Sequence, residues 1–429
     1  MMPRLSWMAM GVGVCLLPMG FAWAGDPVPG PMSLDEEPLT LRDCYQLSLK
    51  RSEELAIKQQ VLEATQGRFL QALSGALPRA SFEASQKRQN GSGNSSFTLK
   101  HVPERRFIFS QPLFAGFKEF AAMAGSRAER RQRLHEKTRA EQLLMVDVSD
   151  AFYLVLEKRE DLSTLEMTRT ALVQRVDELV DRERLGRSRK SEVASVEAQL
   201  RRVEADWEQS KSQEQVAREL LEFLTGLNQV DALNDDEPLP AVLDAEDAYM
   251  AKAAVRPDVK ATEAAWRVAK DAVWIAQAQL WPTVNADADY YTKRVGSAAD
   301  VDWDATLTVD VPLFQGGQAV GKIRETRAQA REAKLQFEKT QREAALDIQE
   351  VYTQLQAALT RQTVLERAFT AAEESYQLQV DDYRKSLVST LDVLQTLQTL
   401  QDVRRDFVRA KYDTKRQYWL LRAATGDGL

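Results

Sequence analysis

The stretch Phe109-Ser-Gln-Pro-Leu-Phe-Ala-Gly116 occurs again as Val309-Asp-Val-Pro-Leu-Phe-Gln-Gly316, 200 residues further along the chain. The same offset of 200 residues aligns Thr225-Gly226 with Thr425-Gly426, near the end of each copy. An offset that holds over so long a stretch indicates an internal duplication, and a repeat changes how the rest of a chain is interpreted. We therefore predict two copies of one structural unit.

Each copy is predicted to begin with a helix, over residues 41–77 in the first copy and 245–280 in the second. Both helices end next to a proline, Pro78 or Pro282, because proline cannot continue a helix. The two prolines are 204 residues apart, so the offset changes by four residues before the repeated Pro-Leu-Phe sequence. A loop between these points can absorb that difference.

Two short segments with alternating apolar and polar residues follow each helix, at about 79–112 and 283–312. The alternation is clearest in the second copy, where one face would hold Val284, Ala286, Ala288, Tyr290, Trp303, Ala305, Leu307, Val309 and Val311. The first copy is similar, with Phe82, Ala84, Phe107 and Phe109 on one face. A period of two predicts β-strands with one apolar and one polar face. We therefore predict one β-hairpin in each copy.

After the Pro-Leu-Phe sequence the hydrophobic pattern becomes helical in both copies. Residues 115–185 contain no proline, and their apolar side chains follow heptad spacing. A helix of about seventy residues is roughly 105 Å long. A turn near 186–188, or near 385–386 in the second copy, is predicted to lead into a return helix. The return helices would end at Gly226 and Gly426, where glycine suits a left-handed C-cap.

The start of the chain has the features of an export signal. Arg4 is followed by an uncharged apolar run, Met8 to Leu17, and by the small-residue cleavage motif Ala22-Trp23-Ala24. The predicted divisions are a signal peptide over 1–24, an extended segment over 25–40, a first repeat over 41–227, a linker over 228–244 and a second repeat over 245–429.

Composition excludes several classes of function. Hydrophobic residues make up 44% of the chain and charged residues 28%, so the chain can bury a core. A net charge of −7 lacks the basic excess that binds phosphate backbones, so we expect no nucleic-acid partner. His101 and His135 are the only histidines, and there are two cysteines. We therefore expect no metal site, no cofactor and no enzymatic activity.

The predicted hairpins raise the question of a membrane. After residue 24 the sequence has no uncharged apolar run of about 20 residues, so any membrane span would be β. Four strands cannot close a barrel, and an open sheet edge in lipid leaves backbone groups unpaired. Three copies would supply twelve strands and close it. The alternative is a periplasmic coiled-coil structural or adaptor protein whose hairpins do not enter a membrane.

Both copies of Pro-Leu-Phe-x-Gly resemble the TolC family of outer-membrane efflux proteins. The run from Tyr383 to Leu394, Tyr-Arg-Lys-Ser-Leu-Val-Ser-Thr-Leu-Asp-Val-Leu, and the closing Ala424-Thr-Gly426 resemble it as well. The resemblance implies a mainly α-helical homotrimer with a small β part. Three protomers would share a twelve-stranded outer-membrane barrel and a coiled-coil tunnel across the periplasm of a Gram-negative bacterium. It also implies a passive channel for efflux or type I secretion, whose partners are outer-membrane lipid, a periplasmic adaptor (membrane fusion) protein and an inner-membrane pump of the RND, ABC or MFS class.

The resemblance also implies positions for the channel aperture. Asp392 matches the aspartate that narrows the periplasmic mouth, and Glu192 is its counterpart in the first repeat. Tyr383 matches a tyrosine that latches the mouth, and Gln395 stands where many members have a second acid. We expect three copies of Asp392 near one axis to raise one another's pKa. A purely structural role for Asp392, as an acid at a helix N-terminus, is compatible with this.

Two further sets of residues complete the expected site. The helix turns are expected to dock on the adaptor, through Gly186, Arg187, Ser188, Ser386, Leu387 and Val388, with Ser386 in place of the usual glycine. The strand-to-helix junctions are expected at Pro112, Gly116, Pro312 and Gly316, where the glycines would relax the turn.

Overall fold

A computed structural model describes residues 38–90, 99–240 and 242–427 of the chain. The predicted signal peptide over 1–24 lies outside the described residues, as does the predicted extended segment up to residue 37. Among the described residues, no helix is both long and apolar enough to cross a lipid bilayer.

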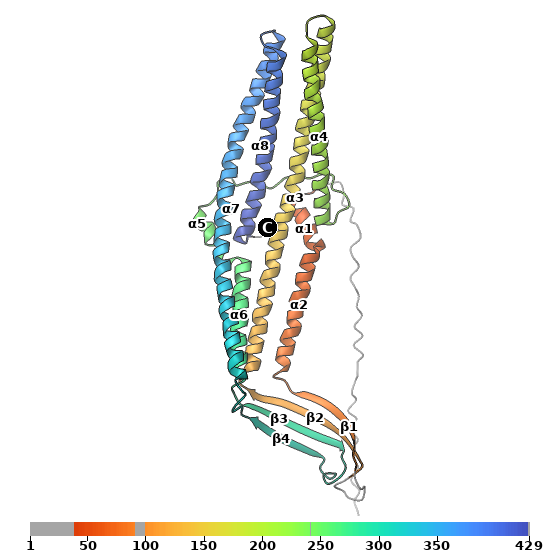
Figure 1. Ribbon diagram of the computed structural model, residues 1–429, viewed down its shortest axis with the longest axis vertical. Helices are drawn as coiled ribbons and strands as arrows, with labels where there is room; N and C mark the ends of the chain where they lie inside the picture. Colours follow the sequence, from red (N-terminus) through yellow and green to blue (C-terminus); the bar gives the residue numbers. More distant parts are fainter. Residues whose placement is uncertain (1–37, 91–98, 241, 428–429) are drawn as a thin grey trace, which may run out of the picture. The chain divides into compact units, whose positions relative to one another are not determined.

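The elements occur in the same order in both halves of the chain (Figure 1). The first half contains α1 (Leu41–Arg51), α2 (Glu53–Ser74), β1 (Arg79–Arg88), β2 (His101–Ala115), α3 (Lys118–Arg184) and α4 (Lys190–Thr225). The second half contains α5 (Glu246–Met250), η1 (Ala253–Val255), α6 (Pro257–Ala278), β3 (Thr283–Lys293), β4 (Trp303–Asp310), α7 (Gln318–Arg384) and α8 (Thr390–Thr425). Helices α3 and α7 each have 67 residues, and α4 and α8 each have 36. The sheet lies at one end of α3 and α7, and the turns into α4 and α8 lie at the other end (Figure 1).

The two helices predicted over 41–77 and 245–280 are each broken, so these predictions were wrong in detail. In the first, Ser52 has an extended backbone and caps α2, because its side chain accepts a hydrogen bond from the amide of Leu55 at 3.3 Å. In the second, Pro257 starts α6 and holds Arg256 out of the helical region, at ψ 138°. The two breaks are 204 residues apart, which is the repeat offset in this region.

The return helices end at glycines, as predicted. The C-cap residues Gly226 and Gly426 have φ values of 74° and 80°, in the left-handed region that favours glycine.

The four strands form one antiparallel sheet in the order β1-β2-β3-β4. Residues directly opposite one another share a face of the sheet. One such row crosses all four strands and contains only aromatic residues: Phe82, Phe107, Tyr290 and Trp303. The next rows on this face pair Ala288 with Ala305, Ala286 with Leu307 and Val284 with Val309. The predicted alternation of apolar and polar faces is therefore confirmed, and β2 and β3 join the two hairpins into one sheet.

Helix α3 is central to the packing, because it contacts α2, α4, α6 and α8. The largest buried side chains include Phe152 and Tyr153 of α3, and the Trp419 indole of α8 donates a hydrogen bond to the Tyr153 hydroxyl at 3.3 Å. A second apolar cluster lies nearer the turns, around Leu172, Leu179 and other α3 and α4 residues. α8 reaches this cluster through Leu394 and Leu397, and so ties the two long hairpins together.

Candidate functional site

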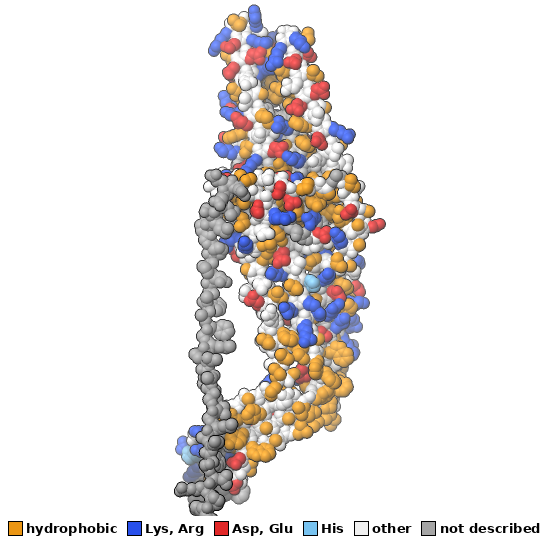
Figure 2. Space-filling view, turned by 180° about the vertical axis from the view of Figure 1, so that it is seen from behind, with side chains coloured by type: hydrophobic (Ala, Val, Ile, Leu, Met, Phe, Trp, Pro, Cys, Tyr) orange, Lys and Arg blue, Asp and Glu red, His pale blue; other side chains and the backbone are white. Residues whose placement is uncertain are grey.

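The apolar face of the sheet is open to its surroundings. The exposed fractions are 67% for Trp303, 64% for Leu307 and 57% for Val309. Those of Phe82 and Phe109 are 55% and 50%. Figure 2 shows hydrophobic side chains gathered in a band over the sheet end of the chain. Water-soluble proteins rarely leave so many large apolar side chains exposed together. The face therefore needs an apolar environment.

The opposite face of the sheet is polar. Arg106 donates hydrogen bonds to Glu83 at 3.0 Å and to Asp289 at 3.4 Å, which lie on the neighbouring strands on either side. The Tyr291 hydroxyl donates a hydrogen bond to Asp304 at 3.0 Å. Charged side chains on this face thus bind one another, as expected for a surface in contact with water rather than lipid.

Both outer strands of the sheet have a free edge within the described residues, because β1 pairs only with β2 and β4 only with β3. Strand β4 also stops early. It ends at Asp310, whereas β2 continues past the equivalent Ser110 to Ala115. The additional β2 residues pair with β3. The equivalent residues after β4 have no neighbouring strand to pair with in the described part of the protomer.

The strand-to-helix junctions are tight turns with two consecutive positive φ angles. In the first copy these are Gly116 at 64° and Phe117 at 61°, and in the second Gly316 at 58° and Gly317 at 88°. The φ values explain the glycines at the predicted junction positions. A Cβ atom on Gly116 would lie 2.9 Å from the carbonyl oxygen of Ala278, so this glycine is also needed for close packing.

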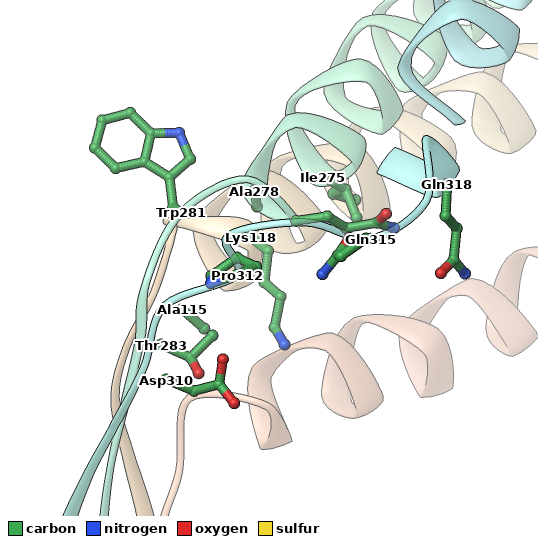
Figure 3. Close-up of a pocket in the computed structure, with 11 residues that line it drawn as sticks. Ala115, Lys118, Ile275, Ala278, Trp281, Thr283, Asp310, Pro312, Gln315 and Gln318 are labelled. Carbon is green, nitrogen blue, oxygen red and sulfur yellow. The ribbon is translucent and has the colours of Figure 1, made fainter. Parts of the chain in front are cut away.

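The two prolines at the predicted junctions occupy different backbone settings. Pro112 lies inside β2, where the pairing with β3 shifts between Pro112 and Phe114. Such an irregularity tolerates a residue without an amide hydrogen. Pro312 lies just beyond the end of β4 and lines a cavity at the junction with Lys118 and Asp310 (Figure 3). In that view the Trp281 indole points away from the Lys118 amino group.

The predicted docking residues lie at the turns between the long and return helices. Gly186 and Ser386 both have left-handed backbones, with φ values of 70° and 63°. The neighbouring Leu185 and Leu387 have exposed fractions of 70% and 69%, so each turn presents a leucine to its surroundings. The remaining predicted residues, Arg187, Ser188 and Val388, belong to the same two turns.

Asp392 is the third residue of α8 and forms a capping box with Ser389. The Ser389 hydroxyl and backbone amide donate hydrogen bonds to the carboxylate at 2.7 and 2.8 Å. These bonds favour the ionised form and lower the pKa of Asp392. The raised pKa that we predicted for three copies near one axis stays a prediction, because the protomer holds one copy and its local donors act in the opposite direction. Glu192 accepts a similar bond from the Ser188 hydroxyl, at 2.6 Å.

Tyr383 connects the two long hairpins near their turns. Its exposed fraction is 6%, and its hydroxyl accepts a hydrogen bond from Arg182 of α3 at 3.0 Å. The guanidinium groups of Arg175 and Arg182 lie 4.3 and 4.9 Å from the centre of its ring, within the range of cation–π attraction. Gln395 is exposed, one turn after Asp392 on α8.

Sequence reasoning singled out Tyr383 but missed its two arginine partners. Arg175 and Arg182 are seven residues apart, so they lie on one face of α3. That spacing was the available signal. It could not be assigned to Tyr383, because the contact joins residues 201 positions apart in the chain.

The chain is similar to several outer membrane efflux proteins and to solved outer-membrane protein structures. The family model for outer membrane efflux proteins matches residues 250–427. Outer membrane protein TolC of Escherichia coli strain K12 is 20% identical over 398 residues, which cover 87% of this chain and 79% of that protein. Outer membrane efflux protein BepC of Brucella suis is 25% identical over 183 residues, 42% of this chain and 40% of BepC. The crystal structure of the outer membrane protein VceC from Vibrio cholerae superposes with a TM-score of 0.79, at 21% identity, covering 90% of this chain and 96% of VceC.

Proposed function

Because the chain belongs to the TolC family of outer-membrane efflux proteins, we propose that three copies form a passive exit duct from the periplasm to the cell exterior. The exposed apolar face of the four-stranded sheet carries this proposal. Burying that face in lipid removes Trp303, Leu307 and their neighbours from water, at about 25 cal/mol per Å² of apolar surface. The alternative of a periplasmic coiled-coil protein leaves the whole face in water.

The free edges of the sheet set the stoichiometry that we propose. A sheet in lipid must close, because each unpaired backbone group costs several kcal/mol there. β4 of one protomer would therefore pair with β1 of the next, and three protomers make a barrel of twelve strands. The polar face, with Arg106 and Tyr291, would then line a water-filled interior.

The repeat predicts the register of that pairing. Within one protomer, Phe109 of β2 faces Ala288 of β3. Adding 200 to Phe109 gives Val309 of β4, and subtracting 204 from Ala288 gives Ala84 of β1. We therefore expect Val309 to face Ala84 of the adjacent protomer, and β4 to extend toward residue 315 as β2 extends to Ala115.

The long helices supply the rest of the duct. A helix of 67 residues is about 100 Å long, so α3 and α7 carry their turns far from the membrane into the periplasm. The exposed Leu185 and Leu387 at those turns would dock on a periplasmic adaptor protein that is coupled to an inner-membrane pump. The chain would act as a conduit, and the pump would supply the energy for efflux or type I secretion.

A disulfide across the proposed seam tests this function. In protein that carries both Ala84→Cys and Val309→Cys, with Cys44→Ser to remove the native thiol, oxidation should give covalent dimers and trimers on denaturing gels. The same protein should form conducting channels in planar lipid bilayers.

The matched control pairs Ala84→Cys with Leu307→Cys, which is two residues out of register on the same face. It should crosslink far less. Equal crosslinking of both pairs would contradict the register. Monomeric protein that neither crosslinks nor conducts would refute the shared barrel and the duct together.

A further inference from the structure

Four cationic residues gather on the helices near the sheet. Arg127 and Arg131 of α3 and Arg267 and Lys270 of α6 line one cavity, together with a single carboxylate, Asp271. All four cationic residues are exposed. We call them the basic patch. Figure 2 shows Lys and Arg side chains gathered directly above the hydrophobic band of the sheet.

The basic patch continues the apolar face of the sheet. Phe114 faces Val284 across the sheet and so belongs to that face. From Phe114 a chain of aromatic rings leads onto α3, with centroids 5.2 Å apart from Phe114 to Phe117 and 6.2 Å apart from Phe117 to Phe120. Arg127 follows Phe120 by seven residues, close to two helical turns, so both point from the same face of α3.

The polar side of the junction supports the same orientation. Lys118 lines a cavity with Asp310, which belongs to the polar face of β4 (Figure 3). Arg127 follows Lys118 by nine residues, or two and a half helical turns, so the two side chains leave α3 in opposite directions. Arg127 therefore lies on the lipid-facing side of the chain.

The basic patch lies at a distance from the apolar face of the sheet that suits the binding of a lipid headgroup. Trp274 of α6 has an exposed fraction of 66%, and tryptophan favours the boundary between lipid and water. Lys270 precedes it by four residues, a rise of about 6 Å, and Arg127 lies about 10 Å beyond Phe120. The headgroup layer adds roughly 5–8 Å to each side of the hydrocarbon core. Long cationic side chains can reach across that layer.

The charges of the basic patch are poorly neutralised by the protein. Arg127, Arg131 and Lys270 make no ion pair within the described residues, and Arg267 alone binds a carboxylate, Glu263, at 2.6 Å. Burial is the main cause that lowers the pKa of His135, one turn after Arg131 on α3. The charges of Lys260 and Arg131 lower it further, whereas Glu263 raises it.

We propose that the basic patch binds the headgroup of an anionic phospholipid in the membrane leaflet that faces the periplasm. This inference rests on the proposed outer-membrane location of the channel. Each trimer would hold three such lipids. They would anchor the first turns of α3 and α6 at the membrane surface, where the sheet ends and the helical duct begins.

The second repeat provides a matched control. By the repeat offsets, Arg327 and Arg331 of α7 correspond to Arg127 and Arg131, but Glu63 and Gln66 of α2 correspond to Arg267 and Lys270. The equivalent surface, formed by α7 and the α2 of a neighbouring protomer, would thus have two cations and one acid. Anionic lipid should prefer the basic patch.

Native mass spectrometry of the detergent-solubilised trimer can measure this preference. We expect phosphatidylglycerol to bind more tightly than phosphatidylethanolamine. Combined Arg127→Gln, Arg131→Gln and Lys270→Gln should weaken phosphatidylglycerol binding roughly tenfold or more, because each cation near an anionic membrane surface contributes about 1 kcal/mol. Combined Arg324→Gln, Arg327→Gln and Arg331→Gln removes the same charge and should leave the affinity nearly unchanged.

Glycerol phosphate distinguishes a lipid site from a site for free phosphate, since it should fail to displace the lipid at equal concentration. Displacement by glycerol phosphate, equal loss in both triple variants, or equal affinity for the two lipids would overturn the proposal, even if all variants form conducting trimers. A wild-type protein that forms no trimer and no channel would instead refute the proposed function and, with it, this lipid site.

Discussion

Ser386 and Phe117 are the two non-glycine residues with positive φ in the described part of the chain. Ser386 is the repeat counterpart of Gly186, and their φ values of 63° and 70° show that both turns need the same left-handed backbone. A side chain in this region costs roughly 1–2 kcal/mol. The second turn therefore carries local strain that the first avoids.

Replacing Ser386 with glycine should stabilise the protein by about 0.5–1 kcal/mol. The gain is smaller than the strain itself, because glycine also increases the conformational freedom of the unfolded chain. Thermal unfolding of the solubilised protein should show a higher melting temperature. The reverse change, Gly186→Ser, should lower the melting temperature. A shift in the same direction for both variants would contradict backbone strain at Ser386.

The two long hairpins contact each other through few side chains near their turns. α7 contributes Tyr383, α3 contributes Arg175 and Arg182, and the Thr390 hydroxyl at the start of α8 lies 3.5 Å from that of Tyr383. We propose that this contact holds the hairpins together in the resting channel. The contact combines a hydrogen bond to the Tyr383 hydroxyl with cation–π attraction to its ring. Removing the hydroxyl alone should therefore weaken the contact less than removing the whole ring.

Removing parts of Tyr383 should therefore raise the resting conductance in a graded way. Tyr383→Phe removes the hydrogen bond from Arg182, worth about 1.5–3 kcal/mol for a charged donor, but keeps both arginines over the ring. Tyr383→Ala removes the hydrogen bond and the cation–π contacts. Single-channel recordings should give the highest conductance for alanine and an intermediate value for phenylalanine. Tyr376→Phe is the control, because the Tyr376 hydroxyl makes no hydrogen bond in the described residues, and an equal effect there would contradict the latch.

Threefold symmetry of the proposed trimer would bring three copies of Asp392 toward one axis. The capping box keeps each carboxylate ionised, since its pKa is lowered by the Ser389 donors. A ring of three negative charges favours cations in the duct. Glu192, at the equivalent place in the first repeat, is the natural alternative for this ring.

Asp392→Ala should reduce the cation preference of the channel in planar bilayers, and Glu192→Ala should change it little. Because the folded pKa is lowered, the wild-type preference should persist as the pH falls to about 4, the usual aspartate value, and be lost only below it. Loss of selectivity in Glu192→Ala but not in Asp392→Ala would place the constriction in the first repeat.

Much of this architecture was accessible from the sequence, because it depends on local patterns. Period-two alternation identified the strands and their apolar face, heptad spacing identified α3 and α7, and glycines marked the turns and helix ends. The breaks at Ser52 and Pro257 were equally local, but the long apolar pattern concealed them. A helix N-cap and a proline outweighed helical periodicity at these two points.

The tertiary structure decided what no local pattern contains. It determined that β2 pairs with β3, that Tyr383 lies against Arg175 and Arg182, and that Arg127 and Lys270 share one cavity. Each of these contacts joins residues more than 100 positions apart, so it depends on how the two repeats pack. Periodicity determines which face of an element is apolar, whereas partner identity follows only when those faces meet in three dimensions.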